Sequence, residues 1–137
     1  MKKREVVTAF IEHGGKVLVL KRSQEVRTYK GRWAGVSGSV EKSPSEQALQ
    51  EISEETGLGR EDIRLVRQGE PLEFADEEKG INWVVHPYLF HANEPDRIRL
   101  DWEHVEMQWI YPGEMEQLDT VPGLAQTLAQ VWGPVEH

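Results

Sequence analysis

Short apolar runs separated by glycine-rich or polar turns predict strands along much of this chain. β-Branched and aliphatic residues dominate Val6 to Ile11 and Val17 to Leu20, with His13-Gly14-Gly15-Lys16 between them. Adjacent glycines supply the positive φ angles of a tight turn, so these runs predict an antiparallel hairpin. Ile63 to Val66 is a short strand candidate, and Ile81 to Phe90 is the longest strand signal.

Three later segments add further expectations. Pro87 lacks a backbone N–H, so within residues 81–90 it predicts an edge position or a bulge. Gly69 to Gly80 is predicted to be a polar connection, with its acidic cluster exposed to solvent. Apolar residues alternate in the segment 105–111, which predicts a strand with Glu106 and Gln108 on its polar face. The residues expected to face the core are Val105, Met107, Trp109 and Tyr111.

The stretch from Ser43 to Gly57 predicts a helix with both ends marked. Ser43 is suited to cap the first turn, Pro44 to occupy the first helical position, and Glu46 to complete a Ser-x-x-Glu capping box. Gly57 is suited to the left-handed conformation that ends a helix. The apolar stripe of this helix comprises Ala48, Leu49 and Ile52.

A last helix is predicted near the end of the chain, capped by Asp119 or Thr120 and ended by Gly133-Pro134. Its buried stripe would comprise Val121, Leu124, Leu128, Val131 and Trp132. The order hairpin, loop, acidic helix, further strands and final helix predicts an α/β protein, an α/β/α sandwich with a mixed sheet. The length, 137 residues, fits a single domain over residues 1–137.

Composition narrows the classes of partner. The formal net charge of −8 argues against a nucleic-acid backbone or an anionic membrane, since both attract basic surfaces. The apolar run from Val6 to Ile11 is too short for a signal peptide, and there is no cysteine for a disulfide. A cytoplasmic protein is expected.

Three carboxylates of the predicted helix, Glu51, Glu54 and Glu55, are spaced three and four residues apart on a face separate from the apolar stripe. Like charges at this spacing cost ~0.2–0.5 kcal/mol per pair, and anions in a last turn cost ~0.3–1 kcal/mol. Carboxylate oxygens are the ligands that Mg²⁺ or Mn²⁺ selects, so a bound cation would relieve both penalties. The alternative is an acidic face that is simply solvated.

Gly38 stands ahead of this helix, which ends Gln50-Glu51-Ile52-Ser53-Glu54-Glu55-Thr56-Gly57-Leu58. This pattern resembles the second half of the Nudix box, Arg-Glu-aliphatic-x-Glu-Glu-x-Gly-aliphatic. The chain departs from the family in three ways. Gln50 replaces the Arg, the linker from Gly38 is two residues shorter, and the early Glu of the box is missing.

The resemblance implies the same α/β/α fold and Mg²⁺-dependent hydrolysis of a nucleoside diphosphate linked to another group, with Mn²⁺ as a substitute ion. Glu54 and Glu55 would hold the metal, and Glu51 would hold metal or accept a proton. The backbone carbonyl that the family offers to the metal would belong to Ser37. A further acidic residue often precedes a tryptophan strand in the family, and Glu103 is the first choice for it, with Glu106 the second.

A basic loop precedes the box. The segment Lys21 to Arg32 carries five cationic residues against Glu25, and its glycine-rich continuation to Gly38 suggests a close backbone approach. Arg22 or Arg32 would stabilise phosphate charge, although a solvated loop is the alternative. Trp33 is assigned to the core, and no role is assigned to His86 or His91.

Two other functions remain open at this point. One is a Nudix module that binds nucleotide without cleaving it, because Gln50 cannot form the ion pair of the family's Arg. The other is an interaction domain whose acidic helix is only a surface. In either enzyme or sensor the partner would be a small nucleoside diphosphate derivative, and a homodimer is compatible with the sequence.

Overall fold

The predicted N-terminal hairpin is confirmed by a computed structural model, which describes residues 1–132. Strand β1 (Lys2–His13) pairs antiparallel with β2 (Lys16–Arg22), and His13 lies opposite Lys16. Gly14 and Gly15 form the turn with φ angles of 60° and 79°, in the left-handed region where glycine carries no steric penalty.

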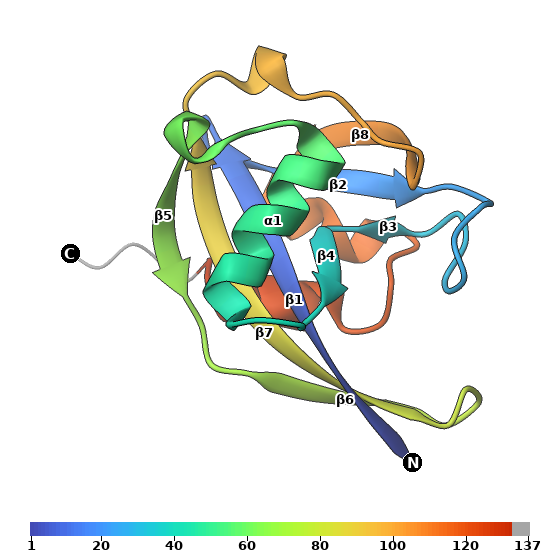
Figure 1. The fold of residues 1–137 in the computed structure, drawn as a ribbon. Coiled ribbons are helices and arrows are strands. Elements are labelled where there is room, and N and C mark those ends of the chain that lie inside the picture. The colour runs from blue at the N-terminus through green and yellow to red at the C-terminus, as the bar shows by residue number, and fades with distance from the viewer. Residues whose placement is uncertain (133–137) are drawn as a thin grey trace.

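Strand β1 lies at the centre of a mixed sheet that has eight strands within the described residues (Figure 1). It pairs in parallel with β7 (Ile81–Ala92) and antiparallel with β4 (Val36–Ser39). Antiparallel partners extend the sheet on both sides: β3 (Trp33–Ala34) and β8 (His104–Ile110) beside β2, and β5 (Ile63–Gln68) and β6 (Leu72–Asp76) beside β7.

Helix α1 (Pro44–Thr56) covers one face of this sheet, and α2 (Leu124–Ala129) packs on the opposite face (Figure 1). Ala48 and Ile52 of α1 are completely buried against residues of β1 and β2, whereas Trp33 is buried in the cluster on the α2 side. Short 3₁₀ helices occur at Arg60–Asp62, Pro95–Arg97 and Pro112–Gln117. The α/β/α sandwich and the core position of Trp33 are therefore confirmed.

Both predicted ends of α1 are confirmed. The Ser43 hydroxyl oxygen accepts a hydrogen bond from the Glu46 N–H at 3.3 Å, and Pro44 opens the helix. Gly57 follows the last turn with φ 78°, and its N–H donates to the Ser53 carbonyl at 3.0 Å. Local side-chain chemistry therefore fixes where this helix starts and stops.

Two predictions about the middle of the chain are wrong. The connection 69–80 contains strand β6, in which Phe74 lies half-buried opposite Trp83 of β7. Pro87 lies in an interior strand, neither at an edge nor at a bulge of β7. On one side of β7 the neighbour changes from β5, which ends opposite Tyr88, to β6, which starts opposite Val85. Pro87 lies in this gap between two partners, which accommodates a residue without an N–H.

The segment forms strand β8 and Trp109 packs against the core as predicted, but the predicted burial is wrong for Val105, Met107 and Tyr111. Val105 and Tyr111 are 64% and 57% exposed, whereas Ile110 and His104 are buried. In the part of the chain that the structure describes, β8 pairs only with β2, so it is an edge strand. Its alternating apolar side chains extend beyond the cover that α1 provides, because that helix packs over β4 and β1.

The predicted cap of the last helix is wrong, because α2 begins after Gly123, which has φ 74°. The Asp119 carbonyl instead accepts the Trp33 N–H, and Thr120 forms a β-bridge with Trp33. Leu124, Leu128 and Val131 are buried as expected, and Val121 and Trp132 are partly buried. Helix α2 ends at Ala129, earlier than predicted, and the predicted stop at Gly133-Pro134 lies outside the described residues. Among residues 1–132, no helix is long and apolar enough to cross a membrane.

Candidate functional site

The carboxylates of α1 run from the solvent into the interior. Glu54 is exposed, Glu51 is half-buried, and Glu55 retains only 2% exposure. Glu51 and Glu55 face each other one turn apart, as the predicted shared face requires, but Glu55 lies at the buried side of that face. Burial, and then the neighbouring Glu51, raise the pKa of Glu55 well above its ordinary value. Burial also raises the pKa of Glu51.

Two glutamines one turn earlier hold the outer carboxylates. Gln47 Nε2 donates to Glu51 Oε2 at 2.8 Å, and Gln50 Nε2 donates to Glu54 Oε2 at 2.9 Å. The Lys42 ammonium in turn contacts the Gln50 oxygen. Gln50 therefore orients a carboxylate with a neutral amide, and Gln47, which the sequence analysis did not single out, does the same for Glu51.

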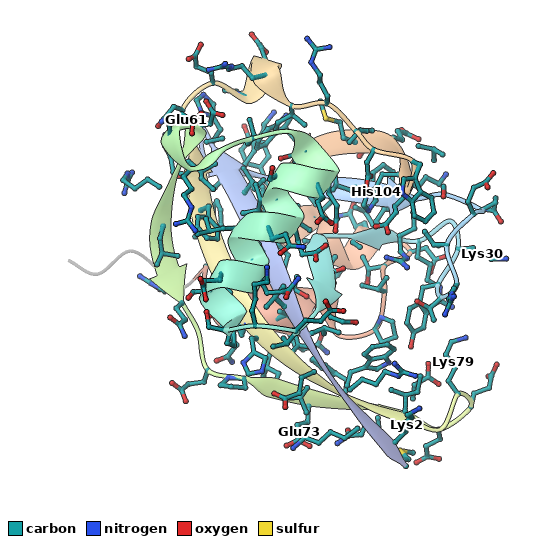
Figure 2. The ribbon with its side chains drawn as sticks, viewed as in Figure 1. Lys2, Lys30, Glu61, Glu73, Lys79 and His104 are labelled. Atoms are coloured by element: carbon teal, nitrogen blue, oxygen red, sulfur yellow. The ribbon has the colours of Figure 1, made fainter. Side chains whose placement is uncertain are left out.

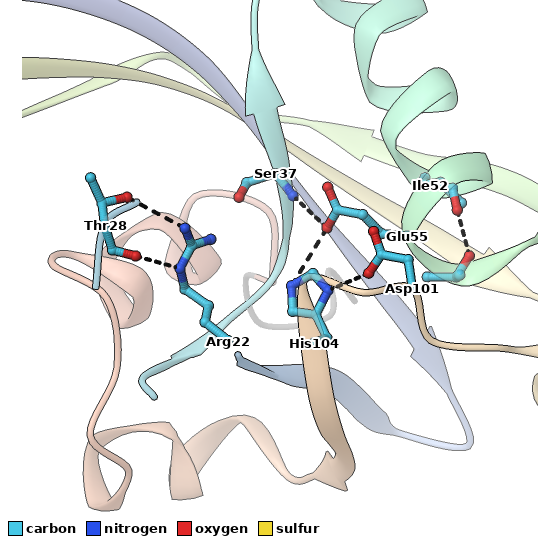
Figure 3. Close-up of polar contacts among 8 residues, drawn as sticks. Arg22, Thr28, Ser37, Ile52, Glu55, Asp101 and His104 are labelled. Carbon is cyan, nitrogen blue, oxygen red and sulfur yellow. Dashed lines mark hydrogen bonds and ion pairs between the residues drawn. The ribbon is translucent and has the colours of Figure 1, made fainter. Parts of the chain in front are cut away.

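The glycine-rich approach to α1 places backbone directly against the acidic site. A Cβ atom added at Gly38 would lie 2.2 Å from Glu51 Cδ, so the Glu51 carboxyl group occupies space that any other residue would fill. The neighbouring Ser37 N–H donates to Glu55 Oε1 at 3.4 Å (Figure 3). The close approach is as predicted, and Ser37 reaches Glu55 through its amide rather than its carbonyl.

Sequence reasoning missed a buried histidine behind Glu55. His104 Nε2 lies 3.7 Å from Glu55 Oε1, and its Nδ1 lies 3.0 Å from Asp101 Oδ1 (Figure 3). The His104 side chain is 1% exposed, and Figure 2 shows it near the C-terminal end of α1. The acidic site therefore includes an imidazole nitrogen, His104 Nε2, beside the carboxylate oxygens.

A β-bulge explains why strand alternation did not reveal His104. Lys21 lies opposite Glu106 but Arg22 lies opposite His104, so Val105 is an extra residue between the two pairs. The bulge turns His104 toward the helix while Val105 stays exposed. The spacing of Asp101 and His104 on either side of Glu103 was the available sequence signal.

A cavity of about 640 Å³ opens beside these groups. Its wall includes carboxylate residues Glu51, Glu54 and Glu103, together with the backbone region of Ser37 and Gly38. Glu103 lies in the turn before β8, as predicted, where its carbonyl accepts the Ser23 N–H at 2.7 Å. Burial and nearby Asp101 raise the pKa of Glu103. Glu106 is exposed on β8 and does not line the cavity.

The two predicted arginines occupy different places. Arg22 lines the cavity, and its Nε donates to the Thr28 carbonyl at 2.9 Å (Figure 3). Burial lowers the pKa of Arg22, opposed by the charges of Glu103 and Glu55. Arg32 does not line the cavity. Its Nε lies 3.8 Å from Asp119 Oδ1, and its guanidinium lies 5.7 Å from the Tyr29 ring centre.

Aromatic residues form the far wall of the cavity. Trp83, Phe74 and Tyr29 line it, and Tyr29 has a positive φ of 51°. The Tyr29 hydroxyl donates to Asp76 Oδ2 at 2.5 Å and accepts from Trp83 Nε1 at 3.0 Å. Burial and then the bond to Asp76 raise the pKa of Tyr29 to about 12. These bonds attach the basic loop to the β6–β7 hairpin. The prediction that the acidic cluster is only solvated is therefore wrong for Asp76.

The residues of the acidic site fit a divalent cation. Glu55 Oε2 and His104 Nε2 are buried and have no hydrogen-bond partner. Ligand atoms of Glu55, Glu103 and His104 all lie within 4.8 Å of one another. Buried polar atoms without partners are costly, and a cation between them would satisfy them.

Comparison with known proteins adds independent information on this fold. The family model described as "NUDIX domain" matches residues 1–131. No curated protein matches the chain.

Several solved structures have the same architecture. A MutT NUDIX hydrolase from Burkholderia pseudomallei is 25% identical with a TM-score of 0.74, over 96% of this chain and 100% of the other. An Ap4A hydrolase from C. elegans is 20% identical with a TM-score of 0.73, over 95% and 94% of the two chains. A NUDIX hydrolase from Nitrosomonas europaea is 20% identical with a TM-score of 0.75, over 94% and 88%.

Proposed function

This chain belongs to the Nudix family, and on that premise we propose that it is a Mg²⁺-dependent hydrolase. Its substrate would be a nucleoside diphosphate linked to another group, and Mn²⁺ would substitute for Mg²⁺. The bond cleaved is the phosphoric anhydride, which yields a nucleotide and a second phosphorylated product. We place this activity in the cytoplasm, a compartment with which a chain without cysteine is compatible.

One observation carries the proposal: Glu51, Glu54 and Glu103 share a cavity of about 640 Å³ with Arg22 and Arg27. Carboxylates alone would repel a diphosphate, and arginines alone would bind it without activating water. Their combination around one space suits a charged phosphate chain and a cation together. The aromatic wall of Tyr29, Phe74 and Trp83 offers apolar surface for a nucleoside portion.

Glu51, Glu54 and Glu55 would hold the cation, beside Ser37. When bound, the ion supplies Lewis-acid polarisation of a phosphate group and lowers the pKa of water.

The protein's own groups would then carry the remaining steps. Gln47 and Gln50 keep Glu51 and Glu54 in place through the hydrogen bonds described above. Arg22, at the end of β2, balances phosphate charge. Arg32 contacts Tyr29 and Asp119 and so helps to hold the loop that follows Arg22. Glu103, whose raised pKa suits a proton acceptor, takes the proton as the water oxygen bonds to phosphorus and the bridging P–O bond breaks.

A nucleotide-binding module without hydrolysis is the second candidate, and the neutral Gln50 at the Arg position favours it. An amide holds Glu54 through one hydrogen bond of 2.9 Å, without the charge of a guanidinium. A less firmly aimed carboxylate would lower turnover and leave the aromatic wall able to bind nucleotide.

The two candidates separate in a substrate screen at a saturating concentration of Mg²⁺ or Mn²⁺. The panel would contain nucleoside triphosphates, nucleotide sugars, ADP-ribose and dinucleoside polyphosphates, the last including Ap4A because one structural relative is an Ap4A hydrolase. For nucleotide sugars, ADP-ribose and dinucleoside polyphosphates, alkaline phosphatase added afterwards converts the phosphomonoester products to inorganic phosphate, which is measured. For nucleoside triphosphates, which that enzyme would itself hydrolyse, inorganic pyrophosphatase replaces it and reports released diphosphate, alongside direct measurement of inorganic phosphate. Glu51→Gln is the matched variant.

The hydrolase proposal expects metal-dependent turnover of at least one class, strongly reduced in Glu51→Gln. Absence of turnover across the panel, together with calorimetric binding of a nucleotide, would favour the sensor instead. Turnover unchanged by Glu51→Gln would exclude the acidic site described here.

A further inference from the structure

We propose that His104 and Glu55, beside Glu103, form a nitrogen-containing cation site that favours a divalent transition metal over Mg²⁺. The inference rests on the proposed function, because Glu55 is one of the carboxylates proposed to hold the cation. It adds a ligand that lies outside the predicted acidic helix and assigns a chemical preference to the site.

The first support is the way His104 is held. Its Nδ1 lies 3.0 Å from Asp101 Oδ1. An ionised carboxylate can only accept, so Nδ1 carries the hydrogen and donates it. A histidine that binds a metal commonly donates its other ring N–H to a carboxylate, which fixes the ring and raises its basicity. Asp101 and His104 have this arrangement.

The second support is the state of the other ring nitrogen. His104 Nε2 is buried, has no hydrogen-bond partner, and points toward Glu55 Oε1 at 3.7 Å. That distance exceeds a hydrogen bond, for which donor and acceptor lie about 2.7–3.2 Å apart. Glu55 Oε2 is buried without a partner as well. Two unsatisfied buried atoms on facing side chains indicate that a third species belongs between them.

The chemistry of the donors decides which cation fits. Mg²⁺ prefers oxygen ligands and retains several waters, whereas imidazole nitrogen favours transition metals. Two ligands on opposite sides of one ion, each bonded at about 2.1 Å, are about 4.2 Å apart. One atom each of Glu55, His104 and neighbouring Glu103 lie within 4.8 Å of one another, so small side-chain shifts would bring Glu55 and His104 to bonding distance of one ion.

The test is pulsed electron paramagnetic resonance of Mn²⁺ bound to the full chain, labelled with ¹⁵N at histidine only. We expect ¹⁵N modulation of the Mn²⁺ echo in the wild type and its loss in His104→Gln. The matched control is His86→Gln, which changes a histidine paired with Glu5 outside the site and should retain the modulation. Absence of modulation in the wild type, or its persistence in His104→Gln, would overturn the proposal.

A second variant keeps the test decisive if His104→Gln does not fold. Asp101→Asn leaves the imidazole in place but removes the charged acceptor, and it should weaken Mn²⁺ binding by about 10–100-fold in calorimetry. Mg²⁺ binding should change much less. Equal losses for both ions would contradict a nitrogen ligand.

Neither readout depends on hydrolysis, so the two proposals fail separately. A hydrolase without ¹⁵N modulation would lose only the His104 assignment. A protein with modulation and no turnover would lose only the proposed activity.

Discussion

The Glu51 carboxyl group fills the space that a side chain at position 38 would need, which makes Gly38 a sensitive position in the site. We predict that Gly38→Ala lowers kcat/KM for the substrate by ~10²-fold, the loss that follows from a misplacement of about 1 Å. The new methyl group would lie 2.2 Å from Glu51 Cδ and push that carboxyl group toward solvent. The melting temperature should change little, because the displaced atoms end a flexible side chain.

Gly113→Ala is the matched control, since nothing lies within 4 Å of a Cβ atom built there. It should leave both kcat/KM and the melting temperature near wild-type values. Equal activity losses in the two alanine variants would show that Glu51 is not the sensitive group.

Glu103 and Glu106 are distinguished by their places in the fold. Glu103 lines the cavity, whereas Glu106 is exposed on β8 opposite Lys21. If Glu103 is the proton acceptor, Glu103→Gln should lower kcat by ~10²–10⁴-fold with little change in melting temperature. Glu106→Gln should have a much smaller effect. Steady-state kinetics of both variants decide the assignment, which fails if the effects are exchanged.

At the residue scale, the sequence predicted which acidic residues come together but did not predict how deeply each is buried. Spacing along α1 identified Glu51, Glu54 and Glu55, because helical periodicity is local. It did not reveal that Glu55 is buried, since that depends on how α1 sits against β4. His104 escaped notice because the bulge at Val105 breaks the alternation on which the strand prediction depended.

At the scale of elements, Tyr29 connects the basic loop to the β6–β7 hairpin. We predict that Tyr29→Phe removes part of the loss of stability between pH 10 and pH 12. The pKa of Tyr29 is raised from 10.0 to about 12, so the folded state holds the phenol proton more tightly. That stabilisation is complete below pH 10 and disappears as the pH rises through 12.

Urea unfolding at pH 8 and pH 11 measures this effect as the change in the free energy of unfolding. Burial also raises the pKa of Tyr88, and that contribution is common to both proteins. Tyr111→Phe, at an exposed position, should leave the alkaline change as in the wild type. If Tyr29→Phe retained the full alkaline loss, the titration of Tyr29 would not be its source.

The elements that the sequence predicted correctly are those whose signals are local. The β1–β2 hairpin follows from Gly14 and Gly15, and the ends of α1 from Ser43 and Gly57. Strand β6 and the position of Pro87 depend instead on pairing with other segments of the chain. Local polarity therefore predicted a loop at residues 69–80, and the propensity of proline predicted an edge or a bulge. Helix α2 starts after Gly123 without a side-chain cap, so no capping residue in the sequence indicated its start.

At the scale of the whole molecule, a bound cation should stabilise the fold. A ligand at 100 times its Kd contributes about 2.7 kcal/mol, which for a chain of this size raises the melting temperature by roughly 10 °C. We predict that Mg²⁺ or Mn²⁺ raises the melting temperature of the wild type more than that of Glu54→Gln. Differential scanning calorimetry with and without metal measures the shift.

Glu106→Gln removes the same charge outside the cavity and should keep the wild-type shift. Identical shifts in the wild type and Glu54→Gln would indicate that the ion binds elsewhere. A shift lost in both variants would point to general charge screening.

The parallel pairing of β1 with β7 also determines when the molecule can assemble. Each β1 residue meets a partner 79 positions later, as His91 meets Glu12. Contacts this distant in sequence require a large loop to close first, which slows folding. During synthesis, β1 can form its hairpin with β2 early, but its other edge remains open until residue 91 has left the ribosome. The nascent chain therefore carries an unpaired apolar strand edge for most of its translation, and unpaired edges of this kind are prone to aggregate.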